Sequence, residues 1–301
     1  MKAALPEKRT LDRRNLATRL ASAAVFASLF LTLLYFGDQP WAKIVFLGMM
    51  AIVVVLGVRE ACLIASRSGL AKPSIFAGTL VGLLFPLHFY LGATPYGDWL
   101  PLWAVLALGG LIIHFGMLIF TKDPLDNALN SQAVTWMAAM YLGIGTGFQQ
   151  KLFMFNETTL SNTGARLVLA LFAIVWLGDT AAYFVGSLLG RHKLAPRVSP
   201  KKTWEGAFGN LAGNIGGAFL IRAFVCTQWS VVDAVVIGLL LGIVGQLGDL
   251  AESTWKRSAG VKDSAMGVGI PGHGGMLDRV DSLVFAAPAL YAYIHFVHGL
   301  N

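Results

Sequence analysis

The chain has 301 residues, of which 56% are hydrophobic and only 13% are charged. These apolar side chains outnumber what one soluble core could bury, which excludes a soluble enzyme, a secreted disulfide scaffold and a disordered chain. At about 20 residues per spanning helix, nine helices would use roughly 180 residues and leave about 120 for loops. The composition therefore predicts an all-α, polytopic transmembrane bundle.

Nine apolar runs are long enough to span a membrane as helices, and none alternates strictly as a membrane strand would. The first run follows a basic stretch, as in a signal peptide, but no small-residue cleavage site comes after it, so we expect a retained helix. The nine predicted spans are Leu20–Phe36, Ala42–Val58, Ser74–Leu91, Trp99–Phe120, Ser131–Phe148, Ala165–Leu189, Gly206–Phe224, Val231–Leu250 and Ser282–Val297.

The basic residues predict which way these spans point. With a cytoplasmic N-terminus, all but four of the 23 Lys and Arg residues fall on the inner side, the exceptions being Lys43, Lys151, Arg166 and Arg222. This bias follows the positive-inside rule, which explains the net charge of +7 without a nucleic-acid partner. We expect a multi-pass protein of the cell's inner membrane.

Charge is distributed unevenly along the chain. Residues 1–175 form an N-terminal region of membrane helices with short loops, whereas residues 176–301 carry two polar inner loops and form the predicted catalytic region. Between Asp249 and Asp281, ten ionisable side chains occur within 33 residues. A solvated inner loop explains the lysines and arginines, but it does not explain the carboxylates or the nearby glycines.

Carboxylates, basic groups and glycines together suit phosphate chemistry. Aspartates supply the hard oxygen ligands that Mg²⁺ prefers, and Lys and Arg bind phosphate oxygens. Glycines let a backbone approach a ligand closely. The second loop, Arg191–Gly206, places basic groups beside hydroxyls and an aromatic ring, which is also what a plain positive-inside loop with proline turns would show. Neither loop contains a Walker A motif, a Rossmann fingerprint or a G-x-S-x-G elbow.

Several of these stretches resemble a known signature. Ser253–Arg257, Lys262–Ser264 and Ile270–Ser282 are similar to the signature of the phosphatidate cytidylyltransferases, also called CDP-diacylglycerol synthases, and so are Gly178–Tyr183 and Ser199–Gly206 upstream. This specific similarity covers about the last 125 residues. The resemblance implies the reaction of CTP with phosphatidic acid to give CDP-diacylglycerol and pyrophosphate, dependent on Mg²⁺.

The resemblance also implies roles for individual residues. Asp249 and Asp278 are expected as principal metal ligands, Asp179 and Asp281 as further candidates, and a second cation is one option. Candidate phosphate and substrate contacts are the basic residues Lys201, Lys202, Lys256, Arg257, Lys262, His273 and Arg279 together with Ser199, while the glycine cradle is Gly272, Gly274 and Gly275. The expected partners are CTP, phosphatidic acid and the bilayer, and the sequence leaves a homodimer open.

Two other functions remain as alternatives. A cation-coupled transporter would use intramembrane Asp179 and Asp249, although such sites lie near the membrane midplane and these charges gather on one face. A CTP-dependent lipid kinase or another lipid phosphotransferase would keep the chemistry and change the acceptor. The glycine-containing segment Ala265–Gly269, longer than the usual spacing of the signature, is expected to act as a hinge within the loop between Asp249 and Asp281.

Overall fold

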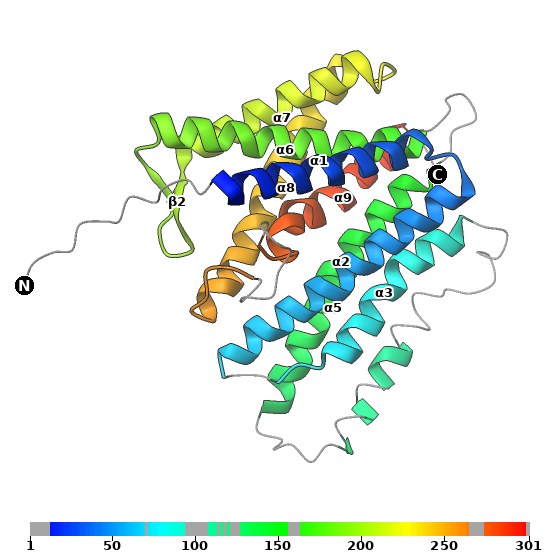
Figure 1. Cartoon of the computed structure of the whole chain (residues 1–301), viewed down its shortest axis with the longest axis vertical. Helices are drawn as coiled ribbons and strands as arrows, with labels where there is room; N and C mark the ends of the chain where they lie inside the picture. The colour runs from blue at the N-terminus through cyan, green and yellow to red at the C-terminus, as the bar shows by residue number, and fades with distance from the viewer. Residues whose placement is uncertain are drawn as a thin grey trace, which may run out of the picture.

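The computed structural model of the chain describes residues 13–69, 72–93, 108–112, 115–116, 119–120, 127–155, 163–264 and 274–298, with side chains described from residue 24 onward. The described part is mainly helical (Figure 1), which confirms the predicted fold class. Its helices are α1 (Arg13–Tyr35), α2 (Pro40–Arg67), α3 (Ile75–Gly92), α5 (Ala128–Phe153), α6 (Thr163–Leu189), α7 (Trp204–Phe224), α8 (Val231–Ser258) and α9 (Leu277–His298). A short antiparallel hairpin of β1 (Lys193–Ala195) and β2 (Ser199–Thr203) joins α6 to α7.

Within the described residues, α2, α3, α6, α8 and α9 are long and apolar enough to cross a membrane. Each of these helices contains one predicted span, so the multi-pass membrane character is confirmed. Helices α1, α5 and α7 also form where spans were predicted. Helices α5 and α7 are long enough, at 26 and 21 residues, but are less apolar, and the apolar part described for α1 is Ala24–Tyr35. Only short helical pieces are described within Trp99–Phe120, so the total of nine spans stays a prediction.

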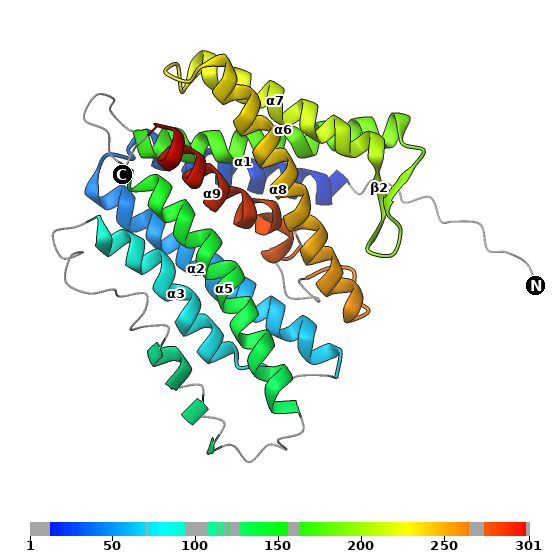
Figure 2. The ribbon, with the colours of Figure 1, turned by 180° about the vertical axis from the view of Figure 1, so that it is seen from behind.

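The helices form two groups with α9 between them. Figures 1 and 2 show α2, α3 and α5 packed side by side, while α6 and α7 lie together on the other side with α1 against α6. Helix α8 packs on α7 and α9, and α9 also contacts α2, α5 and α6. Both groups therefore meet at α9, and what happens at the start of α9 depends on both.

Glycines bring α6 and α7 unusually close. Gly209, Gly213 and Gly217 recur every fourth residue on α7, so they lie on one face of that helix. A Cβ added at Gly213 would lie 2.5 Å from the Cβ of Ala181 and 3.0 Å from the Cα of Gly178, both on α6. Small residues at this spacing allow close helix packing in membranes, where burial of apolar surface supplies little drive.

Two buried apolar clusters fill the bundle. The larger one, around Phe46, Phe153 and Leu290, ties α2 and α5 to α6, α8 and α9. The smaller one, around Val58, Leu142 and Leu277, lies where α2 and α5 meet the start of α9. We call the end of the bundle where α8 ends and α9 begins the polar end, because the charged groups described below gather there.

Candidate functional site

Buried charges mark the polar end. Among the described residues, four charged side chains are buried, and three of them, Glu60, Glu252 and Lys256, lie there. The fourth, Asp233, caps the start of α8 at the opposite end, where it accepts from the backbone of Ser230 at 2.7 Å and from the Tyr293 hydroxyl at 2.6 Å. Because an uncompensated charge is costly inside a membrane protein, this concentration indicates a functional region.

Lys256 joins two carboxylates from different helices. Its ammonium group lies 2.5 Å from Asp278 Oδ1 on α9 and forms an ion pair with Glu252, one turn earlier on α8. The other oxygen of Asp278 accepts from the Ser264 amide at 3.2 Å and the Ser264 hydroxyl at 3.0 Å. Asp278 is thus held by donors from α8 and from the loop before α9, so its position is well defined.

Asp249 lies at the centre of a second group. It forms an ion pair with Lys202 of β2, which connects α8 to the hairpin, and it interacts electrostatically with both Asp179 and Asp281. A Cβ added to the preceding Gly248 would lie 2.3 Å from the Asp281 carbonyl oxygen. Only glycine at that position lets α9 approach α8 closely enough to bring Asp281 beside Asp249.

Asp179 occupies the corresponding place on α6. Its carboxylate accepts from the buried Asn210 at 3.1 Å, and the Asn210 side chain in turn accepts from Gln246 at 3.1 Å and Asn214 at 2.9 Å. The preceding Gly178 contacts Asn214, and a Cβ there would overlap the Asn214 amide. In both Leu177–Ala181 and Leu247–Ala251, the glycine therefore allows a neighbouring helix to pack closely, and the aspartate follows that glycine.

The Glu205 side chain fixes the base of the hairpin. Glu205 accepts from the backbone of Arg191 at 3.1 Å and of His192 at 3.2 Å, and the His192 ring nitrogen lies 2.6 Å from its other oxygen. The hydrogen bond from His192 is the main reason that the pKa of Glu205 falls to about 2, so this carboxylate stays ionised. Thr203 caps α7 by accepting from the Gly206 amide at 3.2 Å. These contacts hold Lys202 in reach of Asp249.

Arg257 connects the two polar loops through their backbones. Its guanidinium group donates to the Val198 carbonyl of the hairpin at 3.1 Å and to the Val261 carbonyl after α8 at 2.9 Å. The structure therefore gives this predicted phosphate contact a tethering role. Because Arg257 is exposed, its remaining donors can still face an anion.

The other predicted residues fall into three classes. Lys201, Lys262 and Arg279 are exposed at the polar end, and Ser199 is half-buried in β2. Gly275 is buried, and Gly274 has a φ of 78°, a conformation that glycine adopts at little cost. His273, Gly272 and the segment Ala265–Gly269 lie outside the described residues, so their predicted roles stay predictions.

The aspartates suit a hard cation by their chemistry. Asp179, Asp249, Asp278 and Asp281 come from α6, α8 and α9, and carboxylate oxygens are the ligands that Mg²⁺ prefers. Within the described part of the chain, no three or more acidic, histidine or cysteine side chains are close enough together to form a complete metal site. Asp249 and Asp278 are each paired with a lysine instead. These carboxylate oxygens are of the kind that a magnesium ion takes as ligands, and substrate oxygens would have to complete its coordination.

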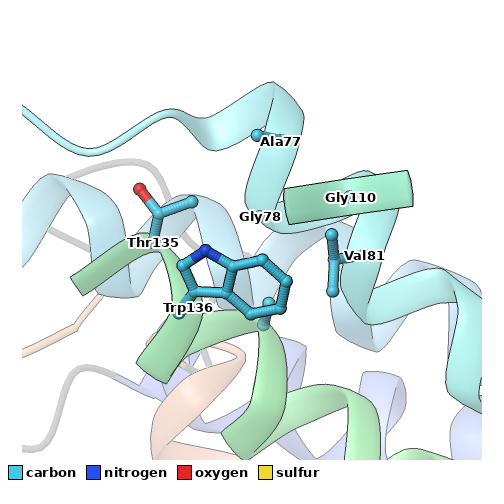
Figure 3. A pocket seen from close by; sticks show the side chains of 7 residues that line it. Ala77, Gly78, Val81, Gly110, Thr135 and Trp136 are labelled. Carbon is cyan, nitrogen blue, oxygen red and sulfur yellow. The ribbon is translucent and has the colours of Figure 1, made fainter. Parts of the chain in front are cut away.

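An apolar crevice elsewhere in the bundle does not belong to this group. It is lined by Ala77, Gly78 and Val81 of α3, Thr135, Trp136 and Ala139 of α5, and Gly110 (Figure 3). None of the predicted site residues lines it. The crevice is therefore a packing feature between helices rather than part of the polar site.

Sequence reasoning missed two acidic residues of the polar end. Glu252 was counted among the loop charges without a role, although it lies one turn before Lys256 on the same helix. Glu60 was missed because the second span was predicted to end at Val58, whereas α2 continues to Arg67. The sequence signal that could have found Glu60 is that it is the single acidic residue within the apolar stretch that follows Val58.

Comparison with known proteins agrees with the resemblance in the sequence. The profile of the cytidylyltransferase family matches residues 17–297 of the chain. A phosphatidate cytidylyltransferase of Staphylococcus epidermidis is 36% identical over 256 residues, which cover 83% of this chain and 94% of that protein. The Staphylococcus haemolyticus enzyme of the same name is 32% identical over 90% of this chain and 96% of its own length. The Brucella suis enzyme is 52% identical over 132 residues, 43% of this chain and 47% of that enzyme.

Proposed function

Because the chain belongs to the cytidylyltransferase family, we infer that it transfers the cytidylyl group of CTP to phosphatidic acid, giving CDP-diacylglycerol and pyrophosphate. In this reaction a phosphate oxygen of the lipid attacks the α-phosphorus of CTP, and the bond to the β-phosphate oxygen breaks. The attacking phosphate monoester has a second pKa of about 6 to 7 by analogy with phosphorylated side chains, so it is already largely ionised near neutral pH. It therefore needs no protein base. The protein has to bring two anions together and align them.

The cations of the polar end are suited to that task. We propose that Lys202, Lys256 and Arg257 lower the repulsion between CTP and the lipid phosphate, with exposed Lys201, Lys262 and Arg279 around them. The observation that carries this proposal is the ion pairing of Lys202 with Asp249 and of Lys256 with Asp278. Each lysine contacts one of the predicted metal ligands directly. Phosphates bound there would therefore face cations from two sides.

We further propose Mg²⁺ as the cofactor, with Asp249 and Asp278 as its principal ligands and Asp179 and Asp281 nearby. When bound, a magnesium ion would neutralise part of the triphosphate charge. Lys202 and Lys256, which lie beside these carboxylates, would bind phosphate oxygens next to the ion. A cation-coupled transporter is less favoured, because three of the four buried charged side chains among the described residues lie at the polar end.

The activity can be tested directly. Purified protein in detergent, given labelled CTP and phosphatidic acid with Mg²⁺, is expected to form a lipid-soluble cytidine product. Omitting the lipid or chelating the metal should remove that product. If label from the γ-phosphate of CTP reaches the lipid instead, the enzyme is a lipid kinase, and the assignment of the transferred group is wrong.

The proposed topology places the polar end in the cytoplasm of a multi-pass inner-membrane protein, with the N-terminus on the same side. We expect a cysteine introduced at exposed Ser258 to resist an impermeant thiol reagent in intact cells and to react after permeabilisation. Cys62 and Cys226 are buried, and both are replaced by alanine for this experiment.

A cysteine at exposed Gln228, between α7 and α8, is the matched control on the opposite side. It should react in intact cells. Reaction of the Ser258 variant and protection of the Gln228 variant would reverse the proposed orientation.

A further inference from the structure

Glu60 is a buried acidic residue of α2, far in sequence from the polar loops. Its side chain is only 4% exposed, and it lies 204 residues before Ser264. A carboxylate so placed needs donors, because an unpaired buried charge is strongly unfavourable. All its donors in the described structure come from the segment around the start of α9.

Three hydrogen bonds satisfy both oxygens of Glu60. One oxygen accepts from the Met276 amide at 2.9 Å, and the other accepts from the Leu277 amide at 2.9 Å and from the Ser264 hydroxyl at 2.8 Å. The Met276 and Leu277 amides stand at the start of α9, where backbone donors have no partner within the helix. Glu60 therefore acts as a helix cap supplied by a distant helix.

The same contacts connect Glu60 to the candidate metal ligand Asp278. The hydroxyl oxygen of fully buried Ser264 lies 2.8 Å from a carboxylate oxygen of Glu60 and 3.0 Å from one of Asp278, so its one proton is shared between the two carboxylates. Asp278 is the residue that follows Leu277, and it also contacts Lys256. Loss of the hydrogen bonds that Glu60 accepts from Ser264 or from the start of α9 would move Asp278 and, with it, the ammonium group of Lys256.

We propose that Glu60 is a positioning residue for the reaction. It fixes the start of α9 and the Ser264 hydroxyl, so that Asp278 and Lys256 are aligned before substrates bind. The N-terminal helices are then part of the catalytic unit and not merely a membrane anchor. This inference rests on the proposed function, since alignment matters only if Asp278 and Lys256 act on the phosphates.

The main test replaces Glu60 with glutamine. Glu60→Gln keeps the size of the side chain, but its NH₂ group cannot accept from the amides of α9. We expect kcat to fall between about 10-fold and 100-fold, as a displacement of about 1 Å can cause, while the KM for CTP changes less than about threefold. Hydrogen exchange at the Met276 and Leu277 amides should become faster.

Thr135→Val is the matched control for lost stability alone. Thr135 is a buried residue of α5 whose hydroxyl accepts from the Ser74 amide at 3.0 Å, so it ties α3 to α5 without touching the polar end. We expect this variant to unfold at a lower temperature with its kcat unchanged. A kcat of Glu60→Gln within about twofold of the parent, or an equal loss in Thr135→Val, would overturn the proposal.

Ser264→Ala supplies a second route to the same answer. It removes the side-chain link between Glu60 and Asp278 without changing α2, so it carries the test if Glu60→Gln does not fold. We expect about a 10-fold loss of kcat, and in the double variant a loss smaller than the product of the two single effects. An unchanged kcat in Ser264→Ala would count against the proposal. If the parent protein does not transfer the cytidylyl group, the proposed function is refuted. Hydrogen exchange at the Met276 and Leu277 amides would still test whether Glu60 holds the start of α9.

Discussion

Replacing Asp249 or Asp278 by asparagine is expected to abolish turnover while leaving the protein folded in the membrane. An amide is a neutral and much weaker ligand for a hard cation than a carboxylate, so metal binding should fail in both variants. Asparagine also cannot form an ion pair, so Asp249→Asn would remove the carboxylate partner of Lys202, and Asp278→Asn would leave Lys256 paired with Glu252 alone. Turnover at saturating Mg²⁺, measured as lipid-soluble cytidine, is the readout.

Asp233→Asn provides the control for loss of a buried aspartate. Asp233 lies at the opposite end of α8, where it caps the helix and accepts from Tyr293. We expect lower thermal stability with turnover unchanged. If Asp249→Asn or Asp278→Asn keeps more than about a tenth of parental activity, the barrier has changed by less than about 1.4 kcal/mol and that residue is not a metal ligand.

Much of the helical architecture follows from the apolar runs. The five helices that can cross a membrane all coincide with predicted spans, because a long uncharged run has one stable solution in lipid. Helix ends were harder to predict. Helix α2 continues past Val58 to Arg67, because the charged pair Arg59 and Glu60 interrupts the apolar run without ending the helix. The short hairpin between α6 and α7 has too few residues for a clear alternating pattern.

The site could be predicted by residue type but not by pairing. Motif resemblance pointed to aspartates and lysines that the structure brings to the polar end, most of them between Asp249 and Asp281, and their roles in binding and catalysis stay predictions. The ion pair between Lys202 and Asp249 depends on how the hairpin folds back, and the role of Glu60 depends on packing of α2 against α9. Contacts between residues about 50 to 200 positions apart leave no periodic trace in one sequence.

The second large effect is expected at Lys256. Its side chain is 10% exposed, and its ammonium group is shared between Asp278 and the fully buried Glu252. Lys256→Met would leave both carboxylates without their cation, and removing one partner of a buried ion pair typically costs about 3 to 5 kcal/mol. We expect a marked fall in the thermal unfolding temperature and no measurable turnover.

Loss of activity in that variant alone would not separate a catalytic role from a structural one. The double variant Lys256→Met with Glu252→Gln separates them, because a neutral amide is far cheaper to bury than an unpaired carboxylate. Its unfolding temperature should therefore recover much of what Lys256→Met loses. If Lys256 acts on the phosphates, turnover should stay absent in the double variant even though its stability recovers, since the cation beside Asp278 is still missing. Recovery of turnover together with stability would mean that Lys256 serves only as the counter-ion of Glu252, and the phosphates would then depend on Lys202 and the exposed cations of the polar end.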